Sequence, residues 1–151
     1  MIGVLGLQGD FAAHGAALSR LGAVWRVVKR AEHLDGLAGL VVPGGESTTL
    51  IRLLDSSSLW EPVRAFAGSR GFLLGTCAGM ILAAREVRSP SQRSLGLIDI
   101  TVERNSYGRQ IESSVRPATL DDVTDLGNGS RPGDEIEAVL VPIARRPRRD
   151  R

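Results

Sequence analysis

Short apolar runs alternate with amphipathic stretches through the first 84 residues of the chain. Four apolar runs are typical of buried parallel strands, and they cover residues 2–7, 24–28, 40–42 and 71–74. Apolar residues spaced three and four apart predict helices between and after them, over residues 11–21, 48–54, 59–66 and 80–84. Strands that alternate with helices predict an α/β fold, with a mainly parallel sheet covered by helices on both faces.

The pattern changes after Arg85. Segments 97–102, 111–115 and 137–141 have the composition of strands, but glycine-rich and charged stretches join them and no long helix separates them. Parallel neighbours usually need a long crossover, whereas antiparallel neighbours need only a turn. We therefore expect a hairpin or an antiparallel extension in this part of the chain.

Length and charge refine this description. With 151 residues, of which 42% are hydrophobic, the chain is long enough for one globular domain, which we assign to residues 1–144. Five of the 19 basic residues and one of the 17 acidic residues lie at positions 145–151. Residues 1–144 therefore hold 14 basic and 16 acidic residues, which gives them a net charge of −2. Such a tail either binds an anionic surface or is a solvated, disordered end, and its lack of apolar periodicity favours the second interpretation.

Other compositional features exclude several classes of protein. No apolar run reaches the roughly 18 residues of a membrane helix, and the first residues do not resemble a secretory leader, so we expect a cytoplasmic protein without a membrane partner. Aromatic residues make up only 4% of the chain, which argues against a nucleic-acid partner. Cys77 is the only cysteine and His14 and His33 are the only histidines, so we expect no metal site and no cofactor.

The most informative motif surrounds Cys77. The sequence Gly75-Thr76-Cys77-Ala78-Gly79 follows an apolar strand and precedes a helix, which is the arrangement of a nucleophile elbow with cysteine as the central residue. The two glycines leave room for the sharp turn, and a helix N-terminus favours the thiolate. A lone cysteine is otherwise most often a buried structural residue. The strand, the spaced glycines and the helix together favour the nucleophile.

A second motif, Pro43–Thr48, also joins an apolar strand to a helix. In an elbow enzyme one oxyanion donor is the N–H after the nucleophile, here Ala78, and the other comes from a neighbouring loop, for which Gly45 is the candidate. The alternative is an ordinary turn in which Ser47 or Thr48 caps the next helix. Phosphate binding is less well supported, because no lysine follows the glycines.

Four segments carry a family resemblance: IGVLGLQGDFAAH, VVPGGESTTL, LLGTCAG and TVERNSYGRQ. In this order and spacing they resemble the glutaminase subunits of pyridoxal 5'-phosphate synthase, the PdxT/SNO family of triad-type class I glutamine amidotransferases. The resemblance implies a flavodoxin-like three-layer sandwich. It also implies hydrolysis of L-glutamine to glutamate and ammonia through a cysteine thioester, with the ammonia passed to a PdxS-like synthase subunit in vitamin B6 biosynthesis.

The resemblance also implies roles for individual residues. Cys77 is the expected nucleophile, and the glutamine is expected to lie against Gly45, Glu46, Ser47 and Arg104, while Gln8 faces the synthase. A guanidinium suits the α-carboxylate of glutamine, which supports the role given to Arg104. The alternative for Arg104 is a surface ion pair with Glu103 or Glu112.

The chain departs from the family towards its C-terminus. The resemblance spans about residues 1–115, and it fades beyond Glu112 and fails after Val139, so we expect a truncated or altered C-terminal part. The family's His-x-Glu pair is not present, and we expect His14 on a helix surface and His33 in an exposed loop. A reading-frame slip is one hypothesis for the altered end. Missing strands would leave an unpaired sheet edge with exposed apolar surface.

Three functions follow from these observations. The first is an ammonia-producing glutaminase that works with a synthase subunit. The second is a binding or regulatory remnant of that subunit, impaired because it lacks the His-x-Glu pair. The third is a DJ-1-like thiol protein, against which the PGGES and VERNSYGRQ segments speak.

Overall fold

The computed structural model describes residues 1–69, 71–104, 114–119 and 135–140. The chain divides into two compact units, Met1–Arg104 and Asn105–Pro142, and each is described by itself. The assignment of residues 1–144 to one domain stays a prediction, and the basic tail 145–151 lies outside the described residues. In the part of the chain that the structure describes, no helix has the length and apolar character needed to cross a membrane.

The first unit contains every strand and helix that we expected over residues 2–84, together with one short 3-10 helix, η1. In chain order its elements are β1 (Ile2–Leu5), α1 (Phe11–Arg20), β2 (Trp25–Val28), η1 (Ala31–Leu34), β3 (Gly39–Val42), α2 (Ser47–Ser56), α3 (Trp60–Ser69), β4 (Phe72–Gly75), α4 (Ala78–Ala83), β5 (Ala84–Arg88) and β6 (Ile98–Glu103).

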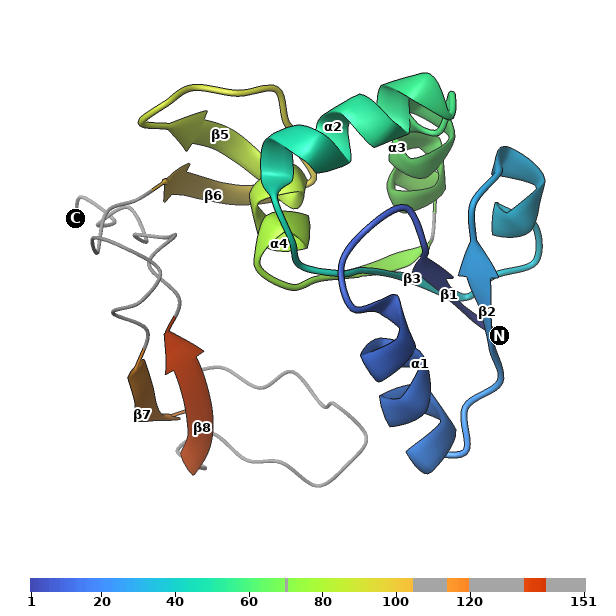
Figure 1. Ribbon diagram of the computed structural model, residues 1–151, viewed down its shortest axis with the longest axis horizontal. Coiled ribbons are helices and arrows are strands. Elements are labelled where there is room, and N and C mark those ends of the chain that lie inside the picture. The colour runs from blue at the N-terminus through green and yellow to red at the C-terminus, as the bar shows by residue number, and fades with distance from the viewer. Residues whose placement is uncertain (70, 105–113, 120–134, 141–151) are drawn as a thin grey trace. The chain divides into compact units, whose positions relative to one another are not determined.

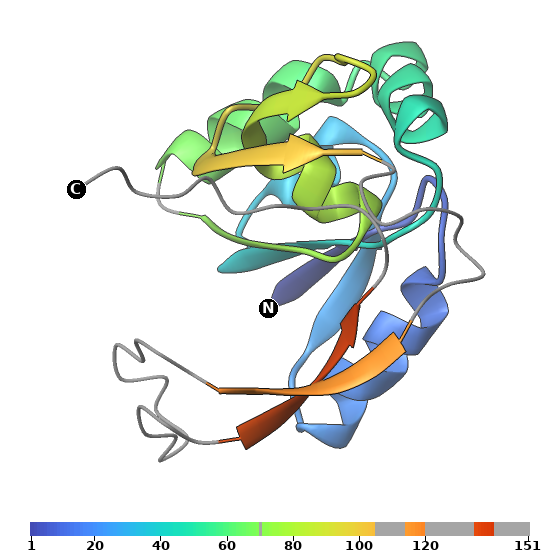
Figure 2. The same ribbon diagram turned by 90° about the vertical axis from the view of Figure 1, so that its left-hand side faces the viewer.

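The first four strands form one parallel sheet in the order β2-β1-β3-β4. Helix α1 lies on one face of this sheet, and α2 and α3 lie on the other (Figures 1 and 2). The α/β class with helices on both faces is therefore confirmed. Because all four strands run the same way, the loops that leave β1, β3 and β4 meet at one edge of the sheet.

The main hydrophobic core lies between the sheet and helices α2, α3 and α4. All four residues of β3 are buried, as expected of a central strand. From the sheet the core takes Leu5, Leu40 and Val42, and from the helices it takes Leu50, Leu54, Val63 and Leu82. On the opposite face Gly15 of α1 lets the helix pack closely, because a methyl group there would overlap the Trp25 indole.

Strand β4 is one of the two outer strands of the sheet, and no other strand pairs with its free side among the described residues. The register pairs Val41 with Leu74, and paired residues of neighbouring strands point to the same face of a sheet. Phe72 and Leu74 therefore lie on the α1 side of the sheet. Their exposed fractions are 82% and 59%. This edge agrees with the expectation of an unpaired strand with exposed apolar surface.

Strand β5 was not predicted, and its pairing corrects our expectation of an antiparallel arrangement after Arg85. Strands β5 and β6 run parallel, with an irregularity between Ala84 and Glu86. Only Ala84 and Val87 of β5 are buried, so the strand lacks the period-two pattern that identifies strands from sequence. Val87 and Val102 form a small second core with Ile81.

The second unit contains an antiparallel pair, β7 (Ser114–Thr119) and β8 (Glu135–Leu140), in which Ser114 pairs with Leu140 and Thr119 with Glu135. The antiparallel expectation is correct for this pair. Segments 111–113 and residue 141, which the predicted strands included, lie outside the described residues.

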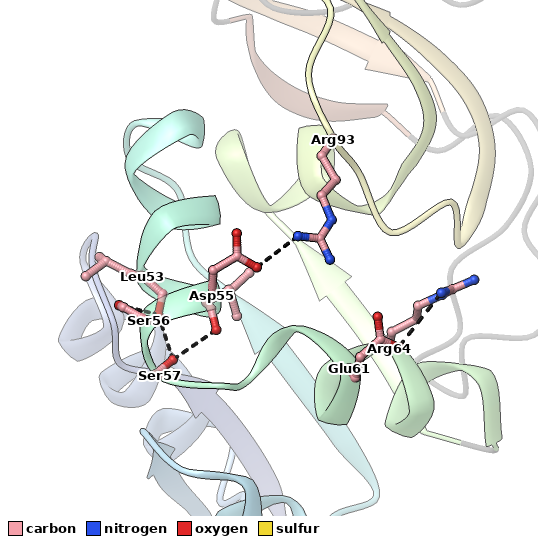
Figure 3. A network of polar contacts seen from close by, with 8 residues as sticks. Leu53, Asp55, Ser56, Ser57, Glu61, Arg64 and Arg93 are labelled. Carbon is pink, nitrogen blue, oxygen red and sulfur yellow. Dashed lines mark hydrogen bonds and ion pairs between the residues drawn. The ribbon is translucent and has the colours of Figure 1, made fainter.

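Helix α2 is held at both of its ends. At its N-terminus the Glu46 carboxylate accepts hydrogen bonds from the backbone N–H groups of Thr48 (2.9 Å) and Thr49 (2.6 Å). At its C-terminus Ser57 donates to the Leu53 carbonyl, and Asp55 forms a 2.9 Å ion pair with Arg93 of the β5–β6 connection (Figure 3). These contacts satisfy terminal backbone groups and tie α2 to that connection.

We predict that Gly79→Ala destabilises the fold by more than about 2 kcal/mol, because the added methyl group would overlap the carbonyl oxygen of Val42 in the buried strand β3. Gly68→Ala is the matched control: Gly68 lies inside α3, and its added methyl group meets nothing within 4 Å. This control should gain about 0.5–1 kcal/mol from its higher helix propensity. Urea unfolding measures both, and equal stabilities would contradict the packing of α4 on β3.

We predict that the contribution of Glu46 to stability depends on pH. Partial burial by itself would raise the pKa of Glu46, but the N–H groups of Thr48 and Thr49 outweigh burial and lower the pKa from 4.5 to about 2. A carboxyl group with a lowered pKa in the folded state stabilises the fold above pH 4.5, and this contribution is lost as the pH falls towards 2.

Glu46→Gln should therefore cost about 1 kcal/mol near neutral pH, the usual value of a helix N-cap, and the cost should shrink as the pH falls below 4.5. Thermal unfolding from pH 7 to pH 3 is the measurement. Glu61→Gln is the control, since the exposed Glu61 carboxylate has only a 3.8 Å ion pair with Arg64 (Figure 3). A difference in stability between Glu46→Gln and the wild type that does not change with pH would contradict the capping role.

Candidate active site

Three loops meet at the carboxyl edge of the parallel sheet. The loop after β1 carries Gln8, the loop after β3 carries Gly44 and Gly45, and the turn after β4 carries Cys77. In open α/β sheets, ligands bind at this edge. The fold therefore brings together residues that lie up to about seventy positions apart in the sequence.

Cys77 has the backbone conformation of a nucleophile elbow. Its φ is 50° and its ψ is −108°, a strained combination for a residue with a side chain. A methyl group on Gly75 would meet the backbone of Gly79, and one on Gly79 would overlap Val42, so both glycines are required by close packing. The Cys77 thiol is free and half-buried. This geometry is that of an elbow rather than of a cysteine in the core.

The glycine loop lies directly against the cysteine. A methyl group built on Gly44 would lie 3.1 Å from Cβ and 3.8 Å from Sγ of Cys77. Gly45 has a φ of +134°, which only glycine adopts readily. Ala78 is the first residue of α4, so its N–H group has no acceptor within the helix. The backbone N–H groups of Gly45 and Ala78 can thus donate hydrogen bonds to an oxyanion next to Cys77.

Gln8 and Glu46 fix the conformation of this loop. Gln8 donates from Nε2 to the backbone carbonyl of Glu46 at 2.9 Å, and the same amide group borders Gly45. The Glu46 carboxylate caps α2, which keeps it ionised well below neutral pH. Gln8 therefore supports the glycine loop, whereas its predicted position facing a synthase stays a prediction.

Arg104 follows β6 and reaches the same region. Its Nη1 donates to Oε1 of Gln92 at 2.7 Å, and its Nη2 lies 3.6 Å from Oε1 of Glu46. The Arg104 side chain is 19% exposed. Glu103 is not its ion-pair partner, and Glu112 lies outside the described residues, so the surface-pair alternative finds no support in the described contacts.

Ser47 is buried, and its hydroxyl group donates to the same Gln92 oxygen at 3.0 Å. Gln92 was not singled out from the sequence, because a polar residue in a connecting loop has neither apolar periodicity nor a motif. The structure therefore brings Glu46, Ser47 and Arg104 together, as the resemblance implied, and adds Gln92 to them. Their binding of glutamine stays a prediction.

The two histidines differ in their positions. His14 was expected on the surface of a helix, but it is half-buried and its Nε2 lies 3.2 Å from Oγ1 of Thr76, the residue before Cys77. The sequence could not reveal this contact, since it joins α1 to the loop after β4. His33 lies in η1, and its Nδ1 accepts from the Lys29 N–H group at 3.3 Å, so the expected loop position is also corrected.

Chemically, the arrangement combines a thiol on a strained turn, two sets of backbone donors and a guanidinium nearby. These groups suit acyl transfer from a substrate that carries an anionic group. Within the described ranges, no three acidic, histidine or cysteine side chains converge as a metal site would require.

Comparison with known proteins identifies the family of this fold and site. A family model described as the SNO glutamine amidotransferase family matches residues 4–144. This match extends beyond residue 115 and Val139, where we expected the resemblance to end.

Individual relatives agree with this match. Pyridoxal 5'-phosphate synthase subunit PdxT of Solibacter usitatus is 49% identical over 147 residues, covering 96% of this chain and 74% of the relative. The subunit of the same name from Geobacillus thermodenitrificans is 51% identical over 148 residues, covering 93% of this chain and 76% of the relative. The corresponding subunit of Deinococcus radiodurans is 51% identical over 124 residues, covering 79% and 63%. The chain thus spans between three fifths and about three quarters of the length of these relatives.

A solved structure titled "Crystal structure of glutamine amidotransferase" superimposes with a TM-score of 0.77 at 39% identity, covering 93% of this chain and 70% of that structure. Sequence and fold agree over the region that carries the cysteine elbow and the glycine loop. The chain belongs to the SNO glutamine amidotransferase family.

Proposed function

We propose that this chain is a glutaminase subunit of pyridoxal 5'-phosphate synthase, which releases ammonia from L-glutamine for use in vitamin B6 biosynthesis. The relatives named above are subunits of that synthase. The observation that carries the proposal is the strained conformation of Cys77, with φ 50°, directly beside the Gly44-Gly45 loop. That conformation presents a nucleophile to backbone oxyanion donors, which is the requirement for attack on a carboxamide.

The charges at the site suit glutamine. Its α-carboxylate requires a cation, and the Arg104 guanidinium, in a side chain that is 19% exposed, lies next to Glu46 of the glycine loop. Its α-ammonium requires an acceptor, for which the Glu46 carboxylate, 3.6 Å from Arg104, carries the needed charge. Ser47 and Gly45 complete the proposed binding residues.

The proposed reaction has two steps. In the first, the Cys77 thiolate attacks the side-chain carboxamide carbon, the oxyanion rests on the N–H groups of Gly45 and Ala78, and the C–N bond breaks as the nitrogen takes a proton and leaves as ammonia. In the second, water attacks the glutamyl thioester and releases glutamate and the Cys77 thiol. Each step moves one proton, so each benefits from a general base or acid.

The proposed function has two versions, which differ in whether a general base is available for turnover. The family resemblance implies a His-x-Glu pair, and the only histidines in these 151 residues are His14 and His33. His14 has its Nε2 directed at Thr76 and His33 accepts from Lys29. This observation favours, as the second candidate, a chain that captures glutamine at Cys77 but turns it over poorly. A DJ-1-like thiol protein has no such support, because the family match covers residues 4–144.

A partner completes the proposal. Ammonia is a small neutral product that water dilutes quickly, so a synthase subunit of the PdxS type must receive it directly. Gln8 supports the glycine loop from the β1 side, and we propose that this side faces the synthase. A cytoplasmic location fits a nucleophile that must stay a reduced thiol.

We predict that a diazo-ketone analogue of L-glutamine labels Cys77, and that Arg104→Ala slows this capture by about tenfold or more, because it removes the cation opposite the α-carboxylate. Mass spectrometry of the labelled chain measures the rate. Arg52→Ala is the control, since Arg52 is an exposed arginine of α2. Iodoacetamide, which has no α-carboxylate, should label all three proteins at equal rates. Equal capture with and without Arg104 would show that this arginine does not bind the substrate.

We predict very low glutaminase turnover for the 151-residue chain, even when it is mixed with a synthase subunit. Loss of the base of a catalytic triad typically costs about three orders of magnitude or more, while oxyanion donors and binding contacts retain a smaller acceleration. Ammonia release from glutamine is the measurement, beside a version whose tail is replaced by a His-x-Glu ending of the family type. Comparable rates would contradict the argument and point to His14, His33 or a partner residue as the base.

A further inference from the structure

The contacts of Gln92 define a small network beside the proposed glutamine site. Its Oε1 accepts from Nη1 of Arg104 at 2.7 Å and from the hydroxyl group of Ser47 at 3.0 Å. Arginine can only donate, so the atom that faces Arg104 must be the amide oxygen and not the amide nitrogen. One oxygen atom thus sets the positions of two side chains that come from different elements, α2 and the end of β6.

We propose that Gln92 is a positioning residue for the substrate α-carboxylate, holding Arg104 and Ser47 in place without neutralising the guanidinium. The inference rests on the proposed function and extends it to a residue that the family resemblance did not implicate. It concerns how tightly the substrate is bound, and not the covalent chemistry at Cys77.

The electrostatic reason is the difference between an amide and a carboxylate. A carboxylate at this position would bind Arg104 as an ion pair and cancel the charge that the substrate needs. Gln92 orients the guanidinium through a neutral oxygen. The nearest acid, Glu46, lies 3.6 Å away and already accepts from two backbone N–H groups, so it competes weakly for Arg104.

The other end of the Gln92 amide points to the same conclusion. Its Nε2 is buried and has no hydrogen-bond partner among the described residues. An unpaired buried donor is costly, and an anionic ligand would supply the acceptor that it lacks. A carboxylate bound by Arg104 would place oxygen atoms in the neighbourhood of this donor.

Gln92 is held in place independently of any ligand. Its neighbour Arg93 forms a 2.9 Å ion pair with Asp55 of α2 (Figure 3), and its guanidinium lies 3.6 Å from the centre of a Trp60 ring. Further along, the Leu95 N–H group donates to the Leu82 carbonyl at 2.7 Å. These contacts fix the connection on the C-terminal side of Gln92. On its N-terminal side the Arg88 carbonyl accepts from the Arg104 N–H group at 3.0 Å, so the network is preorganised rather than formed by the substrate.

The test is saturation kinetics of Cys77 labelling by 6-diazo-5-oxo-L-norleucine with the full chain, which separates the concentration for half-saturation from the limiting rate. Gln92→Met keeps the size of the side chain and removes both hydrogen bonds. We expect it to raise the half-saturating concentration about tenfold, the value of about 1.4 kcal/mol for a lost hydrogen bond to a charged group, with the limiting rate unchanged.

Gln92→Glu discriminates positioning from a structural role. It keeps the shape and an acceptor for both Arg104 and Ser47, so a merely structural role predicts a milder effect than that of Gln92→Met. Neutralisation of Arg104 predicts the opposite, a half-saturating concentration raised more than tenfold. Ser91→Ala, an exposed neighbour in the same connection, is the control and should behave as the wild type.

Iodoacetamide labelling and the urea midpoint are measured for every variant, to show that the elbow and the fold are intact. Two outcomes overturn this inference but leave the proposed function intact, provided that the wild type captures the diazo-ketone normally. One is unchanged capture kinetics in both Gln92 variants. The other is a milder effect of Gln92→Glu than of Gln92→Met. Iodoacetamide labelling of wild-type Cys77 without capture of the diazo-ketone overturns the proposed function, and this inference with it.

Discussion

The sharp turn at Cys77 is the constraint on which the rest of the site depends. A residue with a side chain holds a φ of 50° there only because the surroundings leave it no alternative. Gly75 and Gly79 remove the side chains that would collide, and the Val42 carbonyl accepts from Thr76 at 3.1 Å to fix the start of the turn. The packing of α4 on β3 holds this strained conformation, so the buried central strand and the turn at Cys77 are parts of one arrangement.

The glycine loop depends on the same strand and on a division of roles among charged groups. Glu46 uses its carboxylate to cap α2, which holds the loop against Cys77 and lowers the pKa of Glu46 to about 2. Arg104 is held mainly by a neutral amide oxygen instead of by that acid. The Glu46 carboxylate therefore maintains the backbone, while the charge of Arg104 is left largely uncancelled. Two fully paired charges would stabilise the loop but would leave nothing to attract a carboxylate.

The parts of the fold that sequence predicts are those with a strong local pattern. Parallel strands read as continuous apolar runs, so β1, β3 and β4 and the elbow after β4 follow from residues that are adjacent in the chain. The expected burial of β4 was wrong, because it is an edge strand with Phe72 and Leu74 exposed. Strand β5 was missed because only Ala84 and Val87 are buried in it. The network around Gln92 and the contact of His14 with Thr76 could not be predicted, because each joins residues far apart in sequence and uses a single polar atom. Only the folded chain determines such pairs.

The contrast between features set by local sequence and features that need one distant side chain also bears on which chemical steps a changed C-terminal segment affects. The candidate oxyanion donors are backbone N–H groups, and the elbow requires glycines and close packing, so both depend on the central strand β3 and the edge strand β4. A general base, in contrast, is one side chain that must be supplied at one position. Substrate capture needs the first set, whereas release of product needs the second as well. Under the proposed function, a chain that retains Cys77, Gly45, Ala78 and Arg104 would therefore bind substrate and form the first covalent bond independently of its capacity to turn over.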